Sequence, residues 1–129
     1  MWFMDSPQMN IMNKSLDALW LKQRVISDNI ANKDTPGYKA KYVQFAEILE
    51  EEKCKSPLHR YNHNDLEPTE KILAQVKVSD ETSMRADGNN VNTDKELLEM
   101  DRTSMQYEYL TRKLTNEFST LRVAIKGGR

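Results

Sequence analysis

The chain has 129 residues, of which 38% are apolar, and its 19 Lys and Arg residues nearly balance 20 Asp and Glu residues. With a mean hydropathy of −0.78, this composition indicates one domain with a small or elongated core. The mixed, near-neutral charge gives no electrostatic case for binding nucleic acid or an anionic membrane. The single cysteine, Cys54, excludes an internal disulfide.

The N-terminal residues 1–5 carry neither a basic run nor an apolar stretch of the length that a secretory signal needs. No later segment approaches the roughly 20 apolar residues of a membrane span. If the protein leaves the cytoplasm, we therefore expect it to use a route that needs no cleaved signal peptide.

An apolar repeat of helical period follows Ser6 and Pro7, which suit the cap and the first position of a helix. Steps of three and four residues, with one step of seven, place its members on one stripe. These members are Met9, Met12, Leu16, Leu19, Ile26 and Ile30. Gln23 is the polar residue of the same stripe and could set the register of a partner helix.

The segment 34–37, Asp-Thr-Pro-Gly, is predicted to end this first helix. Pro36 disfavours helical backbone at the residue before it, and Gly37 tolerates the positive φ of a type II turn. The sequence thus predicts a first helix of about 26 residues, roughly 40 Å long.

The middle of the chain is predicted to be small and mixed. Residues 39–52 carry Tyr42, Phe45, Ile48 and Leu49 at helix-like spacing, which favours a short amphipathic helix. Residues 53–70 are polar and are interpreted as an exposed, mobile loop. The alternation over 74–78 predicts a half-buried strand, and Asp-Gly-Asn-Asn at 87–90 predicts a turn.

A second long helix is predicted at the C-terminal end. Thr93 and Glu96 match the capping box, so this helix should begin at Asp94 and run for about 32 residues. Gly127 and Gly128 end the pattern. Its apolar stripe consists of Leu97, Met100, Tyr107, Leu110, Leu114, Phe118, Leu121 and Ile125.

These elements predict a mainly α fold in which two long terminal helices pack as an antiparallel coiled-coil-like pair. The central segment is expected to be partly β and partly disordered. We divide the chain into an N-terminal helix (1–32), a central segment (33–93) and a C-terminal helix (94–129). On pattern alone, the stripes suit the core of a self-contained helical hairpin as well as an assembly surface.

No pattern of residues predicts catalysis, a cofactor or a metal site. The spacing C-x4-H-x3-H within residues 54–63 lacks the fourth ligand of a closed zinc site. Residues 87–95 resemble a calcium loop only in part, because Val91 stands at a ligand position and Lys95 adds positive charge. A solvated loop and a turn before a helix cap are the simpler interpretations, and we predict that the protein is not an enzyme.

Two segments carry a resemblance to a known family. The first, Ala31-Asn32-x-x-Thr35-Pro36-Gly37-Tyr38-Lys39, resembles the signature of the axial proteins of the bacterial flagellum, which form its rod, hook and hook-associated parts. The second, Arg85-x-Asp87-Gly88-Asn89-Asn90-Val91 with Glu96, Glu99 and Met100, resembles the rod members of that family, as does the end of the chain at 121–128. The short chain points to the proximal rod.

The resemblance implies a structural subunit of the basal body's proximal rod that transmits torque for motility. Its terminal helices would pack along the inner wall of the rod. It would pass through the flagellar type III export apparatus and assemble with FlgC, FlgF, FlgG and FliE, on the periplasmic side of the inner membrane or within the cell envelope.

The resemblance also assigns the two stripes to the assembly interface. These residues are Met9, Met12, Leu16, Leu19, Ile26, Ile30, Met100, Tyr107, Leu110, Leu114, Phe118, Leu121 and Ile125. The alternative is a soluble helical adaptor or export chaperone, which would use the same stripes to bind partner helices and would remain in the cytoplasm.

Overall fold

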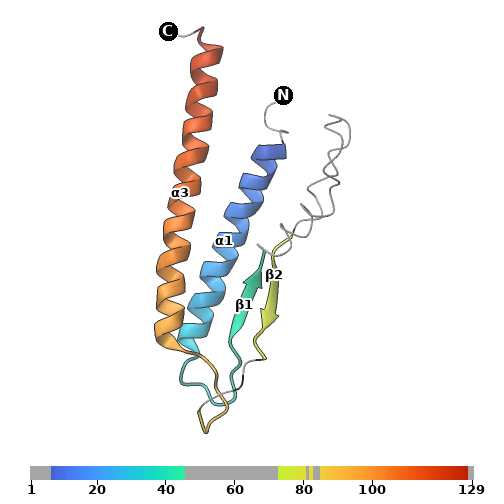
Figure 1. The fold of residues 1–129 in the computed structure, drawn as a ribbon, viewed down its shortest axis with the longest axis vertical. Coiled ribbons are helices and arrows are strands. Elements are labelled where there is room, and N and C mark those ends of the chain that lie inside the picture. The colour runs from blue at the N-terminus through green and yellow to red at the C-terminus, as the bar shows by residue number, and fades with distance from the viewer. Residues whose placement is uncertain (1–6, 46–72, 81, 83–84, 128–129) are drawn as a thin grey trace.

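The computed structural model describes residues 7–45, 73–80, 82 and 85–127. Its elements are α1 (Pro7–Ala31), β1 (Lys41–Gln44), β2 (Gln75–Val78) and α3 (Thr93–Ile125). The two helices lie side by side and run in opposite directions, and the two strands lie beside α1 (Figure 1). The predicted mainly α fold with an antiparallel helix pair is confirmed.

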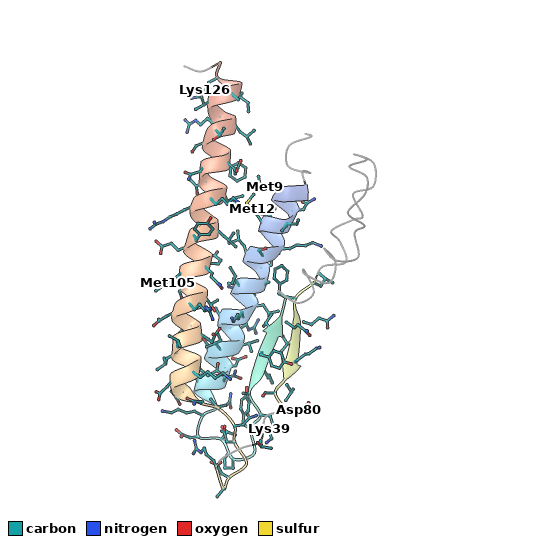
Figure 2. The ribbon with its side chains drawn as sticks, in the orientation of Figure 1. Met9, Met12, Lys39, Asp80, Met105 and Lys126 are labelled. Atoms are coloured by element: carbon teal, nitrogen blue, oxygen red, sulfur yellow. The ribbon has the colours of Figure 1, made fainter. Side chains whose placement is uncertain are left out.

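Helix α1 begins at Pro7 and spans 25 residues, close to the predicted length. Met9 and Met12 lie near its N-terminal end and are buried (Figure 2). Ile26 is also buried, whereas the remaining members of the predicted stripe are half-buried: Leu16, Leu19, Gln23 and Ile30. The stripe therefore faces into the molecule along the whole helix.

The strands β1 and β2 form an antiparallel pair in which Lys41 lies opposite Val78 and Val43 lies opposite Val76. The strand predicted within residues 74–78 is confirmed over Gln75–Val78, but the predicted half-burial is wrong, because all four residues of the strand are exposed. The short helix predicted over residues 39–52 is wrong at residues 41–44, because these residues pair with β2 and receive their backbone hydrogen bonds across the sheet. The rest of that prediction, including Ile48 and Leu49, and the loop at 53–70 lie outside the described residues.

Helix α3 spans 33 residues and begins at Thr93. The predicted capping box is wrong, because the side chain of Asn92 caps the helix by accepting from the backbone N–H groups of Asp94 and Lys95. The N–H of Glu96, which the Thr93 hydroxyl was expected to accept from, instead donates to the backbone carbonyl of Asn92 at 3.0 Å. At the other end, Gly127 has a φ of 69°, so the helix ends where the sequence predicts.

The core of the described part is small and contains both apolar and polar side chains. Ala18 and Val25 of α1 and Val91 before α3 are buried with the residues named above. Three polar side chains are almost fully enclosed: Asn29 at 0%, Asn89 at 0% and Thr103 at 1% exposure. Neither described helix is long and apolar enough to cross a membrane.

Candidate functional site

The signature segment 31–39 forms a turn at the end of α1. The backbone N–H of Thr35 donates to the carbonyl of Asn32 at 3.1 Å, and that of Tyr38 donates to the carbonyl of Thr35 at 3.3 Å. Gly37 between them has a φ of 73°, a left-handed conformation that side chains with a Cβ rarely adopt. The predicted helix stop is therefore confirmed.

Asn89 holds this turn from the second signature segment. Its side-chain amide nitrogen donates to the carbonyls of Asn32, Lys33 and Thr35 at 3.0, 3.0 and 2.9 Å. Its side-chain oxygen accepts from the backbone N–H of Val91 at 2.8 Å. One fully buried amide thus satisfies carbonyls that the end of α1 leaves without helical partners.

The two glycines of the signature segments lie against each other. Gly88 has a φ of 78°, and a Cβ built on it would come within 3.8 Å of the Cα of Gly37. The backbone N–H of Gly37 donates to the carbonyl of Asp87 at 2.9 Å. Arg85 adds a hydrogen bond to the carbonyl of Lys33 at 3.1 Å. The two segments, predicted separately, therefore form one site.

Asn29 makes a second buried amide contact that the sequence analysis missed. Its side-chain nitrogen donates to the carbonyl of Lys41 at 2.7 Å and to a carboxylate oxygen of Glu96 at 3.2 Å. Its side-chain oxygen accepts from the backbone N–H of Lys41 at 3.0 Å and from the hydroxyl of Tyr38 at 3.2 Å. Asn29 thereby joins α1, β1 and α3.

Asn90 completes this arrangement between the strands. Its side-chain oxygen accepts from the backbone N–H of Ala40 at 2.6 Å, and its nitrogen donates to the carbonyl of Ser79 at 3.4 Å. We call Asn29, Asn89 and Asn90 the amide clasp. No buried side-chain nitrogen or oxygen in the described part of the chain lacks a hydrogen-bond partner. The amide clasp is therefore a fully hydrogen-bonded network, and it fixes how the end of α1, the strands and the start of α3 are arranged.

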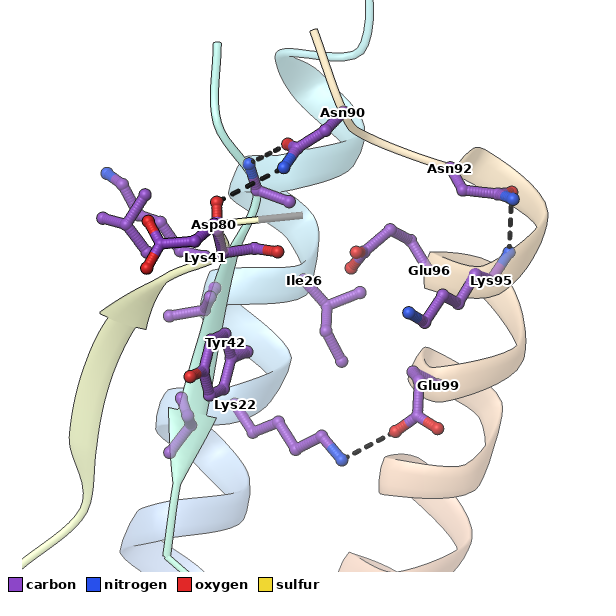
Figure 3. A pocket seen from close by; sticks show the side chains of 15 residues that line it. Lys22, Ile26, Lys41, Tyr42, Asp80, Asn90, Asn92, Lys95, Glu96 and Glu99 are labelled. Carbon is purple, nitrogen blue, oxygen red and sulfur yellow. Dashed lines mark hydrogen bonds and ion pairs between the residues drawn. The ribbon is translucent and has the colours of Figure 1, made fainter. Parts of the chain in front are cut away.

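A cleft of about 710 Å³ opens beside the clasp, between α1, the strands and the start of α3 (Figure 3). On its α-helical side, Lys22 donates to Glu99 at 2.7 Å. Glu99 also belongs to the turn in which the buried hydroxyl of Thr103 donates to the Glu99 carbonyl at 2.6 Å. Charges of both signs line this cleft, so it offers no single-sign field for an ionic ligand.

Two neighbouring carboxyl groups of α3 have pKa values shifted in opposite directions. Burial raises the pKa of Glu96 above its ordinary value of 4.5, although the hydrogen bond from Asn29 partly offsets this effect. The hydrogen bond from Lys22 lowers the pKa of Glu99 below 4.5. Relative to a free carboxyl group, the fold therefore makes ionisation of Glu96 harder and ionisation of Glu99 easier.

These shifts predict pH effects of opposite sign. Because the folded-state pKa of Glu96 is raised, its contribution to stability is present below pH 4.5 and is lost as the pH rises through the folded-state pKa. Glu99 contributes above pH 4.5, and its contribution is lost as the pH falls through its lowered pKa. Urea unfolding at a series of pH values measures how the free energy of unfolding depends on pH. The Glu96→Gln variant should show a weaker dependence just above pH 4.5. The Glu99→Gln variant should show a weaker dependence just below pH 4.5. An unchanged profile in either variant would contradict the corresponding shift.

The predicted assembly residues of α3 divide into two groups. Met100, Leu110, Leu114 and Leu121 are half-buried. Tyr107, Phe118 and Ile125 remain exposed, at 41%, 42% and 84%. Since the stripe residues of α1 are buried or half-buried, the exposed members of the two stripes all lie on α3.

No group of three His, Cys, Asp or Glu side chains within the described ranges is placed to hold a metal ion. The sequence spacing that suggested zinc, Cys54 with His59 and His63, lies outside those ranges. Asp87 of the suggested calcium loop instead accepts from the backbone N–H of Asn89 at 3.1 Å and pairs with Arg85 at 3.1 Å.

Comparisons with known proteins agree with the resemblance to the flagellar rod proteins. A family model described as flagella basal body rod protein matches residues 15–39, which include most of α1 and its turn. The flagellar basal body rod protein FlgB of Bacillus subtilis is 35% identical over 120 residues, covering 92% of both chains. FlgB of Borrelia hermsii is 35% identical over 127 residues, covering 91% of this chain and 94% of its own. FlgB of Escherichia coli is 28% identical, covering 83% and 84%. The chain belongs to the FlgB family of flagellar basal body rod proteins.

Proposed function

We propose that this chain is a structural subunit of the rod of the bacterial flagellar basal body, and that the α1–α3 pair is the part that packs against neighbouring subunits. Its similarity to FlgB proteins along about nine tenths of its length carries the proposal. The clasp adds a physical reason, because it fixes the angle between the helices before a neighbour binds.

The exposed apolar side chains of α3 support a role in assembly. Ile125 is 84% exposed near the end of a helix that is longer than α1, at 33 residues against 25. The eight extra residues extend about 12 Å. Apolar surface left open at the end of a long helix is typical of a protein that completes its core by binding another chain.

The finer assignments belong to the same proposal. We infer a position in the proximal rod, with FlgC, FlgF, FlgG and FliE as neighbours, and passage through the flagellar type III export apparatus to the periplasmic side of the inner membrane. The buried and half-buried stripe residues of α1 would then support assembly indirectly by holding α3 in place.

The test is immunodetection of the chain in purified basal bodies of its own bacterium. A rod subunit should be retained in basal bodies after detergent extraction, and deletion of its gene should abolish swimming. A chaperone or adaptor should instead stay in the cytoplasmic fraction, and that distribution would overturn the proposal.

A further inference from the structure

One face of α3 leaves large apolar side chains exposed at a regular interval. Its members recur at every seventh position, which is the repeat of a helix that packs in a left-handed coiled coil. Thr103, the buried residue of α3, is turned about 100° from this face. The face therefore points away from the core. We call it the outer seam; its members are Leu97, Ser104, Thr111, Phe118 and Ile125, all exposed.

The outer seam can lose water without leaving a threonine hydroxyl unpaired. Within α3, the Thr111 hydroxyl donates to the carbonyl of Tyr107 at 2.8 Å. The Thr115 hydroxyl, next to the seam, donates to the carbonyl of Thr111 at 2.9 Å. Because both protons are already bonded inside the helix, burial of these side chains costs no donor its partner. The largest open side chains, Phe118 and Ile125, are 42% and 84% exposed, so the seam is suited to a dry, apolar contact.

The outer seam matches itself when two copies of α3 run in opposite directions. With Thr111 of one copy opposite Thr111 of the other, Leu97 falls opposite Ile125 and Ser104 falls opposite Phe118. A phenyl ring then meets a small side chain on both sides of the centre, which suits close packing. Parallel helices would instead set Phe118 against Phe118 and leave a gap between the two Ser104 side chains.

The charges beside the seam fit the same pairing. Asp101 and Arg122 each follow a seam member by four positions, so they lie on the same flank of the helix. In the antiparallel pairing, Asp101 of each copy falls within about 1.5 Å, along the helix axis, of the level of Arg122 in the other copy. No ion pair between described residues uses either group in the single chain. Two new ion pairs can therefore form, one toward each end of the contact.

No like charges meet along this flank of the described helix. Glu108, which already binds Arg112 of its own chain, falls opposite the uncharged Thr115. Asp94 falls within one helical turn of Lys126. Parallel helices would instead set each charged side chain beside its own copy, and like charges in contact are costly. The charge order therefore selects the antiparallel arrangement of two identical chains.

From this self-match we infer that the free protein forms a two-fold dimer through the outer seams of two antiparallel α3 helices. The inference goes beyond the proposed function, because it concerns the protein before it enters any larger structure. A two-fold contact uses the same patch on both copies, so the dimer closes and cannot extend into a filament. It would cover Phe118 and Ile125, whose exposure supports the proposed assembly role, until neighbouring subunits replace it.

Single cysteines test this contact in the purified, full-length chain. In a Cys54→Ser background, Thr111→Cys places a thiol at the two-fold axis. Treatment with a short bismaleimide should give a product of twice the 15.1 kDa mass of the chain. The matched control is Ser104→Cys, on the same seam. Because Ser104 lies opposite Phe118, the two control thiols would be about 21 Å apart and should give no product.

The other results of this test count against the inference. Cross-linking of both variants would show parallel helices, and cross-linking of neither would show that the seams do not meet. The unmodified chain at about 0.1 mM should also sediment as a dimer, since weaker association would not be a stable contact. A monomer or a larger assembly at that concentration overturns the inference.

Charge reversal, measured by sedimentation, tests the two ion pairs. Asp101→Arg and Arg122→Asp should each weaken the dimer by about tenfold, because each variant sets two pairs of like charges against each other. An equimolar mixture of the two variants should dimerise like the unmodified chain, because one copy then carries two positive groups and the other carries two negative groups. Lys113→Asp is the matched control. Lys113 lies about 200° around α3 from Thr111, so this variant should dimerise normally.

The mixture also guards against misfolded variants, because recovery of the dimer requires both chains to be folded. Single variants that dimerise as tightly as the unmodified chain, or a mixture that fails to recover, overturn the inference. The rod function is judged separately by fractionation. A chain that is monomeric in solution yet retained in basal bodies overturns the dimer and leaves the rod function standing.

Discussion

Replacing Asn89 with Ala is expected to lower the free energy of unfolding by roughly 2–4 kcal/mol, because each buried group left unpaired costs about 1–3 kcal/mol. Asn89 is 0% exposed, and its amide nitrogen alone serves three carbonyls. Its oxygen also serves the N–H of Val91. Urea unfolding of the purified protein, followed by circular dichroism, measures the change.

The control for this variant is Asn116→Ala on the exposed face of α3. Surface substitutions of this kind usually change stability by less than about 0.5 kcal/mol. Equal unfolding midpoints for the Asn89→Ala variant and the control would show that the amide clasp does not stabilise the contact between the turn after α1 and the segment before α3.

Placing Asp at Leu16 or Leu114 is expected to prevent assembly while leaving export intact. Both leucines are half-buried members of the two facing stripes. An unpaired carboxylate there loses hydration at a cost on the order of 2–4 kcal/mol and separates the helices. Strains with either variant should export the protein yet fail to swim, which motility agar and electron microscopy of basal bodies would measure.

Lys113→Glu is the matched control, since Lys113 neighbours Leu114 but is exposed. Exposed helix charges contribute less than about 1 kcal/mol, so this strain should swim. Normal swimming and complete basal bodies in both Asp strains would remove the stripes from the mechanism of assembly.

The helices could be predicted from the sequence because their apolar repeats are long. The two repeats have six and eight apolar members at helical spacing, and Pro or Gly marks the ends of each repeat, so a helix is the secondary structure that fits. The strand β1 could not be predicted in this way. A four-residue strand depends on a partner, and β2 begins 31 residues after β1 ends. Meanwhile the three-residue step from Tyr42 to Phe45 also fits a helix.

Asn29 escaped prediction for a related reason. A polar residue in an amphipathic helix is usually exposed, and nothing near Asn29 in the sequence indicates otherwise. Its partners Lys41 and Glu96 lie 12 and 67 positions away. The same distant contact explains why the predicted capping box is wrong. The carboxylate of Glu96 accepts a hydrogen bond from Asn29, and the side chain of Asn92 caps the helix instead.

The reach of the amide clasp has a consequence for the order in which the chain folds. Asn89 binds Asn32 across 57 positions, and closing a loop of that length costs roughly 3–4 kcal/mol of chain entropy beyond a constant term. A chain that emerges from a ribosome or a narrow channel with its N-terminus first cannot meet that cost until the residues around 89 have also emerged. Until then, α1 has neither its clasp nor its partner helix, and a 25-residue helix alone is only marginally stable in water. The fold is thus delayed until most of the chain is free, which keeps the part still being threaded in an extended form.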